Sequence, residues 1–326
     1  MAQPPPPPSP LVPEGFEHGD AVGPVLLGVA GFLAAMMMII YIAREPTRSW
    51  PEYFMHRSNS AKKATLTALF QRCVAEFIGT FFLTATIELT AGQSRAPLSP
   101  LAIGSTLMCL TFALGHVSGG HFNPAITLAV LFRGKIEPIP TIVYIAVQLV
   151  GAFGGAAIET MTLGDSCINA NIYGPAGPEG PPGCGSGFPY HNREYPTEVG
   201  LLTEFLYSFM LATVYLNVSS SPTKENNQYF GLAVGFAMTV GAVAAGDVSG
   251  GVFNPAVGTA LPAIHGNHQT IWMYWIGPCL GMSLAAFVFR FVTGTGDAER
   301  YLEEKQRELL QEQQLALPES GHGSGR

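Results

Sequence analysis

Residues 116–131 read HVSGGHFNPAITLAVL, and residues 247–261 repeat the pattern as DVSGGVFNPAVGTAL. Both copies contain Val-Ser-Gly-Gly-x-Phe-Asn-Pro-Ala, and their asparagines, Asn123 and Asn254, are 131 residues apart. A single Asn-Pro pair commonly marks a turn or a helix start. A nine-position pattern that occurs twice at this distance indicates that the chain contains a duplicated unit.

Each copy is expected to begin a short helix. Asn is a favoured N-cap residue, and proline suits the first helical position because its missing N–H needs no partner there. The apolar run that follows ends at Arg133-Gly134 in the first copy and at His265-Gly266 in the second. About ten residues at 1.5 Å each give roughly 15 Å, half of a bilayer core of about 30 Å. We therefore predict two half-helices whose N-termini meet inside a membrane, at a pore or a binding site.

The composition indicates a polytopic membrane protein. Of the 326 residues, 48% are hydrophobic and 12% are charged, whereas a soluble domain has about 25% charged residues. The net charge of −7 comes largely from the C-terminal tail. Because the chain is not basic overall, we expect no nucleic-acid partner. We expect a lipid bilayer around it.

Long apolar runs predict six membrane spans, at residues 66–90, 99–117, 139–158, 198–217, 229–245 and 271–292. They define an expected channel domain at 66–293, followed by a charged, solvated cytoplasmic tail at 294–326. Three spans lie between the two asparagines. Three is an odd number, so the two halves must be inverted relative to one another.

The N-terminal region predicts an additional span. Residues 1–21 are proline-rich and acidic, and we expect them to be disordered. Residues 22–43 are uncharged and long enough to cross a membrane; a cleaved signal peptide is disfavoured because the preceding segment is acidic. Residues 44–65 are basic, so the positive-inside rule places this linker in the cytoplasm and the N-terminus outside.

Each half also carries a glutamate within its first span. Glu76 lies in AEFIGTFFLT, 47 residues before its asparagine, and Glu204 lies in TEFLYSFMLA, 50 residues before its own. An ionisable group inside a membrane is costly. Two glutamates in matching places therefore indicate a function rather than an accidental lipid-facing position.

The two Asn-Pro-Ala motifs, called boxes below, and the paired glutamates carry a resemblance to a known family. In these features the chain resembles the aquaporins, the major intrinsic protein family, over about residues 66–293. The resemblance implies an all-α membrane bundle of six tilted helices and two re-entrant half-helices, assembled as a homotetramer with one pore per subunit. The span at 22–43 would be an addition to this fold. The resemblance places the pore centre at the two Asn-Pro-Ala boxes: Asn123, Pro124, Ala125, Asn254, Pro255 and Ala256.

The resemblance also assigns residues that support the pore loops. Glu76 and Glu204 would accept hydrogen bonds from the loops, and Gln148 lies within a span nearby. His116 and His121 would lie in the first loop, with His121 the better candidate to bond near the channel. No carboxylate or cysteine joins them at ligand spacing, so no metal and no cofactor is expected.

The selectivity filter implied by the resemblance is apolar. Its four positions are Ile103, Ala242, Gly251 and Val257. Water-selective members carry an arginine where this chain has Val257, so the ring should be wider and less polar than a strict water filter. Tyr274-Trp275 is similar to the water-channel branch of the family.

We therefore predict a passive channel for water and small neutral solutes, in the plasma membrane or an internal, vacuolar-type membrane. One alternative is a channel mainly for ammonia, urea, glycerol or hydrogen peroxide, with poor water flow. Another is a structural membrane protein with a vestigial pore. No nucleophile–base constellation is present, so we do not expect an enzyme. Cys167 and Cys184 lie in one loop and would pair only if it faces an oxidising compartment.

Overall fold

The computed structural model describes residues 59–91, 98–163, 195–220, 227–265 and 268–292, together with residues 303, 306, 307 and 310. The additional span expected at 22–43 lies outside the described residues. So do the proline-rich tail, most of the C-terminal tail, and the two loop cysteines, Cys167 and Cys184.

Six helices in the described part are long and apolar enough to cross a membrane. They are α3 (Asn59–Ala91), α4 (Ser99–Ser118), α6 (Pro138–Leu163), α8 (Thr197–Ser219), α9 (Phe230–Ser249) and α11 (Ile271–Val292). The six expected spans are thus confirmed, and the chain is an integral, multi-pass membrane protein. Helix α3 begins earlier than the expected residue 66, so the end of the predicted linker is helical.

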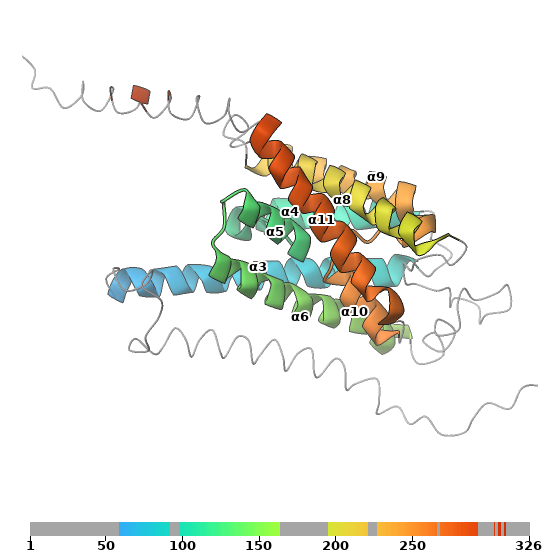
Figure 1. Cartoon of the computed structure of the whole chain (residues 1–326). Helices are drawn as coiled ribbons and strands as arrows, with labels where there is room; N and C mark the ends of the chain where they lie inside the picture. The colour runs from blue at the N-terminus through green and yellow to red at the C-terminus, as the bar shows by residue number, and fades with distance from the viewer. Residues whose placement is uncertain are drawn as a thin grey trace, which may run out of the picture.

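The helices pair in the same way in both halves. Helix α3 packs along α6 in the first half, α8 packs along α11 in the second, and α4 packs against α9 where the halves meet. Figure 1 shows α3 lying along α6, with α11 crossing over α8. We call the side of the bundle where α3 ends the outer face, following the orientation that the basic residues before it predict.

Glycines allow the paired helices to approach closely. A Cβ atom on Gly151 of α6 would lie 2.7 Å from the Phe77 carbonyl oxygen of α3, and one on Gly281 of α11 would overlap the Phe205 carbonyl of α8. Small residues at helix crossings let backbones pack together where the surrounding lipid supplies no hydrophobic driving force. The matching positions show that the duplication extends to the packing.

Two short helices follow the two boxes. Helix α5 (Pro124–Phe132) has Asn123 as its N-cap, as expected, and packs against α11 of the other half. Helix α10 (Val257–Ile264) packs against α6. Each half-helix therefore contacts the last span of the opposite half. Because α6, α8 and α9 separate them in the chain, α5 and α10 enter from opposite faces.

The start of α10 differs from the expectation. Its regular helix begins at Val257, and its N-cap is Ala256 rather than Asn254. Ala256 already has helical backbone angles, φ −68° and ψ −47°. Gly258 N–H donates to the Asn254 carbonyl at 2.8 Å. The first helical turn thus extends back to the box, although the regular hydrogen-bond pattern begins later.

Candidate functional site

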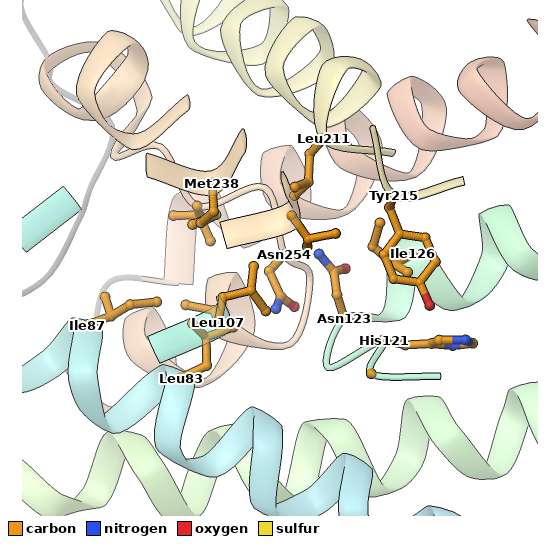
Figure 2. Close-up of a pocket in the computed structure, with 14 residues that line it drawn as sticks. Leu83, Ile87, Leu107, His121, Asn123, Ile126, Leu211, Tyr215, Met238 and Asn254 are labelled. Carbon is orange, nitrogen blue, oxygen red and sulfur yellow. The ribbon is translucent and has the colours of Figure 1, made fainter. Parts of the chain in front are cut away.

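The two boxes are linked by a reciprocal pair of hydrogen bonds. The Asn123 side chain donates from Nδ2 to the Phe253 carbonyl at 2.8 Å, and the Asn254 side chain donates to the Phe122 carbonyl at 2.9 Å. Figure 2 shows the two asparagines at the centre of the pocket. The N-termini of α5 and α10 therefore meet at this point, as the duplicated sequence predicts.

Each asparagine also stabilises the start of its own half-helix. Asn123 Oδ1 accepts from Ala125 N–H at 2.8 Å, and Asn254 Oδ1 accepts from Ala256 N–H at 3.0 Å. An amide nitrogen carries two hydrogens. Among the described residues, each asparagine uses one of them for the opposite box. The second hydrogen of each remains available to a molecule in the cavity between them.

The loops before both boxes share an uncommon backbone conformation. Two glycines and one phenylalanine in each loop have positive φ angles: Gly119 (96°), Gly120 (67°), Phe122 (48°), Gly250 (92°), Gly251 (60°) and Phe253 (49°). Glycine adopts this left-handed region readily, whereas a phenylalanine there is strained. The strain is offset by the hydrogen bonds that this conformation allows the loop N–H groups to make.

Glu76 receives the N–H groups of the first loop. Its Oε1 accepts from the Ser118 hydroxyl at 2.6 Å and from His121 N–H at 3.0 Å. Its Oε2 accepts from Phe122 N–H at 2.6 Å and from Gln148 Nε2 at 2.8 Å. The carboxylate is fully buried, so these four donors replace the water that it loses.

Glu204 has the same arrangement in the second loop. Its Oε1 accepts from the Ser249 hydroxyl at 2.7 Å and from Val252 N–H at 3.0 Å, and its Oε2 accepts from Phe253 N–H at 2.7 Å. The fourth donor of the first half has no equivalent, since Pro278 stands where the repeat would place Gln148.

His121 is held by Thr127. The Thr127 hydroxyl donates to the Asn123 carbonyl at 2.9 Å and accepts from Gln148 Nε2 at 2.9 Å. His121 Nδ1 lies 3.1 Å from the same hydroxyl oxygen. A threonine hydroxyl has one hydrogen, so Nδ1 must be the donor in this contact. A neutral His121 then has Nε2 as a hydrogen-bond acceptor.

The other predicted site residues, His116 and the four filter positions, do not all lie at the central cavity. His116 lies in the last turn of α4 with an exposed side chain, so it does not support the loop in this structure. Ala242 and Gly251 lie in contact, because a Cβ atom on Gly251 would be 3.2 Å from Ala242 Cα. Ile103 is buried, but only Val257 of the four predicted filter residues lines the central cavity.

The cavity between the boxes has a volume of about 20 Å³, room for the centre of about one water molecule. Among the described residues, those that line it carry no charge: Leu83, Ile87, Leu107, Gly120, His121, Asn123, Ile126, Leu211, Tyr215, Val234, Met238, Val252, Asn254 and Val257. Of the described lining residues, the polar side chains are those of the two asparagines, His121 and Tyr215. Such a cavity suits a small uncharged molecule that accepts hydrogen bonds at its centre.

Most of the lining residues are related in pairs by the duplication, including those that the sequence analysis missed except Gly120 and Val234. Equivalent places in the two halves hold Leu83 and Leu211, Ile87 and Tyr215, Leu107 and Met238, His121 and Val252, and Ile126 and Val257. The internal repeat was the signal that could have identified them. The polar members of these pairs, His121 and Tyr215, both lie at the inner end. The outer half of the cavity is therefore the apolar half.

Comparison with known proteins agrees with this arrangement. The family model of the major intrinsic proteins matches residues 63–289. A glycerol uptake facilitator-like protein of Lactiplantibacillus plantarum is 32% identical over 70% of this chain and 100% of its own length. A probable aquaporin of Oryza sativa is 28% identical over 74% of this chain and 91% of its own.

A solved structure extends the likeness to the fold. The aquaglyceroporin of Plasmodium falciparum superposes with a TM-score of 0.56 at 18% identity, over 70% of this chain and 98% of the other. The two interlocked boxes, the six spans and the match of the family model over most of the chain lead to one conclusion. The chain belongs to the major intrinsic protein family.

Proposed function

We propose that this protein is a passive transmembrane channel for water and small neutral solutes. The observation that carries the proposal is the uncharged cavity at which the two half-helices meet. A molecule that crosses the bundle along this route passes between Asn123 and Asn254. The names of the relatives, a glycerol uptake facilitator and an aquaporin, support a substrate of this size and polarity.

The boxes would act on the solute through their donors. A water molecule between Asn123 and Asn254 can accept one hydrogen bond from each, which directs its own hydrogens away from the centre. Each half-helix also presents about half a positive charge at its N-terminus. Both ends point at the cavity, so cations are repelled and a proton is not relayed along the file of water molecules.

The filter would admit more than water. The expected ring of Ile103, Ala242, Gly251 and Val257 offers no charge and no side-chain donor. A solute such as urea or glycerol therefore meets no fixed cation there. We infer that its passage is limited by the size of the constriction and by the cost of losing its hydration.

A second candidate is a solute channel with poor water flow. The specific observation in its favour is the apolar outer half of the cavity, where Ile87, Val252 and Val257 stand. Hydrophobic constrictions of this kind can empty of water and so restrict its flow. In this case the protein would conduct ammonia, urea, glycerol or hydrogen peroxide and little water.

Stopped-flow measurements on proteoliposomes would test these proposals. Vesicles containing the full chain are exposed to an osmotic gradient of an impermeant solute and then to gradients of urea and glycerol. Fast shrinkage followed by solute-driven recovery supports the leading proposal. Slow shrinkage with fast recovery supports the second. Rates equal to those of protein-free vesicles for water and for every solute named above, ammonia and hydrogen peroxide included, would overturn both and leave a structural protein with a vestigial pore.

We further propose that the chain assembles as a homotetramer in the bilayer. The outward faces of the spans carry many exposed apolar side chains, which suit lipid or a neighbouring subunit: Phe82, Leu101, Phe112, Phe236, Val243 and Phe287. Chemical crosslinking in native membranes should give a four-subunit species. Recovery of monomers alone at complete crosslinking would contradict this assembly.

A further inference from the structure

A buried ionisable pair lies at the outer end of the bundle, away from the boxes. Glu88 of α3 and His265, the C-cap of α10, are 1% and 4% exposed. The His265 Nε2 atom lies 2.5 Å from Glu88 Oε1. The two residues are 177 positions apart in the chain, so this contact ties the end of a half-helix to the first span.

The pair has no equivalent in the other half. The repeat places Leu216 where the first half has Glu88, and it places Gly134 where the second half has His265. Leu216 is fully buried, so an aliphatic side chain satisfies the same position of the fold. The duplicated architecture therefore does not require an ionisable pair at this place.

Burial makes the pair costly. Removing a carboxylate and an imidazole from water carries a desolvation penalty that a hydrogen bond between them only partly offsets. Apolar residues of similar volume are often equally stable or more stable in such a place. A penalty of this kind is also expected inside a membrane. The contact between α3 and α10 therefore lowers stability relative to apolar packing. The other half shows that the fold can place an apolar residue at this position.

The two helices that the pair joins both line the cavity. Helix α3 contributes Leu83 and Ile87, the latter next to Glu88 in the chain, and α10 contributes Val257 at its inner end. Helix α10 is only eight residues long, so its outer end is about 11 Å from Val257 at 1.5 Å per residue. Because α10 has only about two turns, a displacement of His265 would also move Val257 at the cavity wall.

We propose that Glu88 and His265 are a positioning pair that fixes α10 against α3 and so sets the gap between Val257 and Ile87. This gap lies in the apolar outer half of the cavity, where size rather than charge decides which solute passes. Loss of the pair widens the gap and favours a solute larger than water. The inference rests on the proposed channel function, of which it is a refinement.

The test compares the ratio of urea permeability to water permeability in proteoliposomes of the full chain. The variants are Glu88→Leu, which copies the residue of the other half, His265→Leu, and the exchange Glu88→His with His265→Glu. Glu198→Leu is the matched control, because Glu198 is an exposed acidic residue in the first turn of α8 at the same face.

Each single variant should raise the ratio about threefold or more, the size of effect that a lost coupling between two contacting residues produces. The exchange, which restores the pair in reverse, should return the ratio to the wild-type value, and the control should leave it unchanged. A general loosening of the fold would not be repaired by the exchange.

Three results would count against the inference. Unchanged ratios in both single variants, with normal insertion, overturn it, and so does an exchange that behaves like the single variants. If Glu88→Leu does not insert, Glu88→Ala takes its place, because it removes the contact with His265 Nε2 without adding an apolar side chain; an unchanged ratio in that variant overturns the inference equally. Absence of flux in the wild type overturns the channel function itself, a result distinct from the others.

Discussion

Ile87 and Tyr215 occupy equivalent positions in the two halves, since each follows the buried glutamate of its own half by eleven residues. Both line the cavity. The Tyr215 hydroxyl donates to the Gly119 carbonyl at 2.8 Å, whereas Ile87 has no polar group to offer. This substitution, together with His121 in place of Val252, thus makes the two ends of the pore chemically different.

Ile87→Tyr should make the outer half resemble the inner half. The repeat places its hydroxyl toward the Gly250 carbonyl, the equivalent of Gly119. Because the cavity has little spare volume, we expect urea permeability to fall about tenfold, the effect of a few added atoms in a tight pocket, and water permeability to fall less. Leu101→Tyr, on an exposed position of α4, is the control. Unchanged permeability to both urea and water would show that Ile87 does not face the conduction path.

Asn254→Leu should reduce conduction about tenfold or more. The leucine removes the bond to the Phe122 carbonyl and the donor that remains for the solute, and a lost buried hydrogen bond costs about 1–3 kcal/mol. Stopped-flow rates at matched protein density measure the effect. Asn217→Leu removes an amide of the same kind, bonded to the Thr213 carbonyl in α8, and should conduct normally. Normal flux through Asn254→Leu would refute the role of the boxes.

Val257→Arg should lower the ratio of urea to water permeability. The arginine adds a long side chain, a fixed charge and five donors to an apolar wall. Val257→Leu, which adds bulk without charge, separates the two effects and should change the ratio less. Membrane insertion of each variant is established first, because the charge is buried at a residue with no exposed surface. A ratio that rises in Val257→Arg would place the filter elsewhere.

Glu76→Gln should destabilise the protein more than Glu204→Gln. The amide group that replaces a carboxylate oxygen is a donor, and it would face donors that the carboxylate now accepts. Glu76 accepts four hydrogen bonds and Glu204 three, and each buried bond that is lost costs about 1–3 kcal/mol. The unfolding temperatures of the two variants, measured in detergent, show which variant is less stable. A larger loss at Glu204 would contradict this count.

Gly79→Ala should disturb the first pore loop from outside it. A Cβ atom on Gly79 would overlap the Phe122 ring, and Phe122 is already held at a strained φ of 48°. We expect a lower unfolding temperature and reduced flux. Gly246→Ala, in α9, meets no atom within 4 Å and should be neutral or stabilising by up to about 1 kcal/mol. Equal behaviour of the two variants would mean that the loop tolerates displacement of Phe122.

The sequence alone predicted the spans, the two half-helices and the inversion, because each leaves a local signal. A run of apolar residues marks a span, and Asn-Pro after Ser-Gly-Gly marks a helix start. The glutamates at 76 and 204 were notable because a charge in an apolar run is rare. These features can be predicted without knowing which face of a helix points inward.

The lining of the cavity was harder to predict for that reason. A span is apolar on its lipid face and on its inner face alike, so periodicity does not distinguish Ile87, which lines the cavity, from Phe82, which is exposed. The contact between Glu88 and His265 joins residues with no sequence signal that relates them. His116 shares its residue type with His121 but lies on the helix rather than in the loop.

The reciprocal bonds between the boxes have a consequence for biogenesis. Asn123 and Phe122 emerge from the ribosome about 130 residues before their partners, Phe253 and Asn254. Until then the amide of Asn123 and the carbonyl of Phe122 lack these partners inside the membrane, where water is scarce. The first half can insert its spans, but the hydrogen bonds at the centre of the pore form only after the second half has crossed the bilayer. A ribosome stalled between α8 and α9 would therefore hold an inserted, non-conducting intermediate.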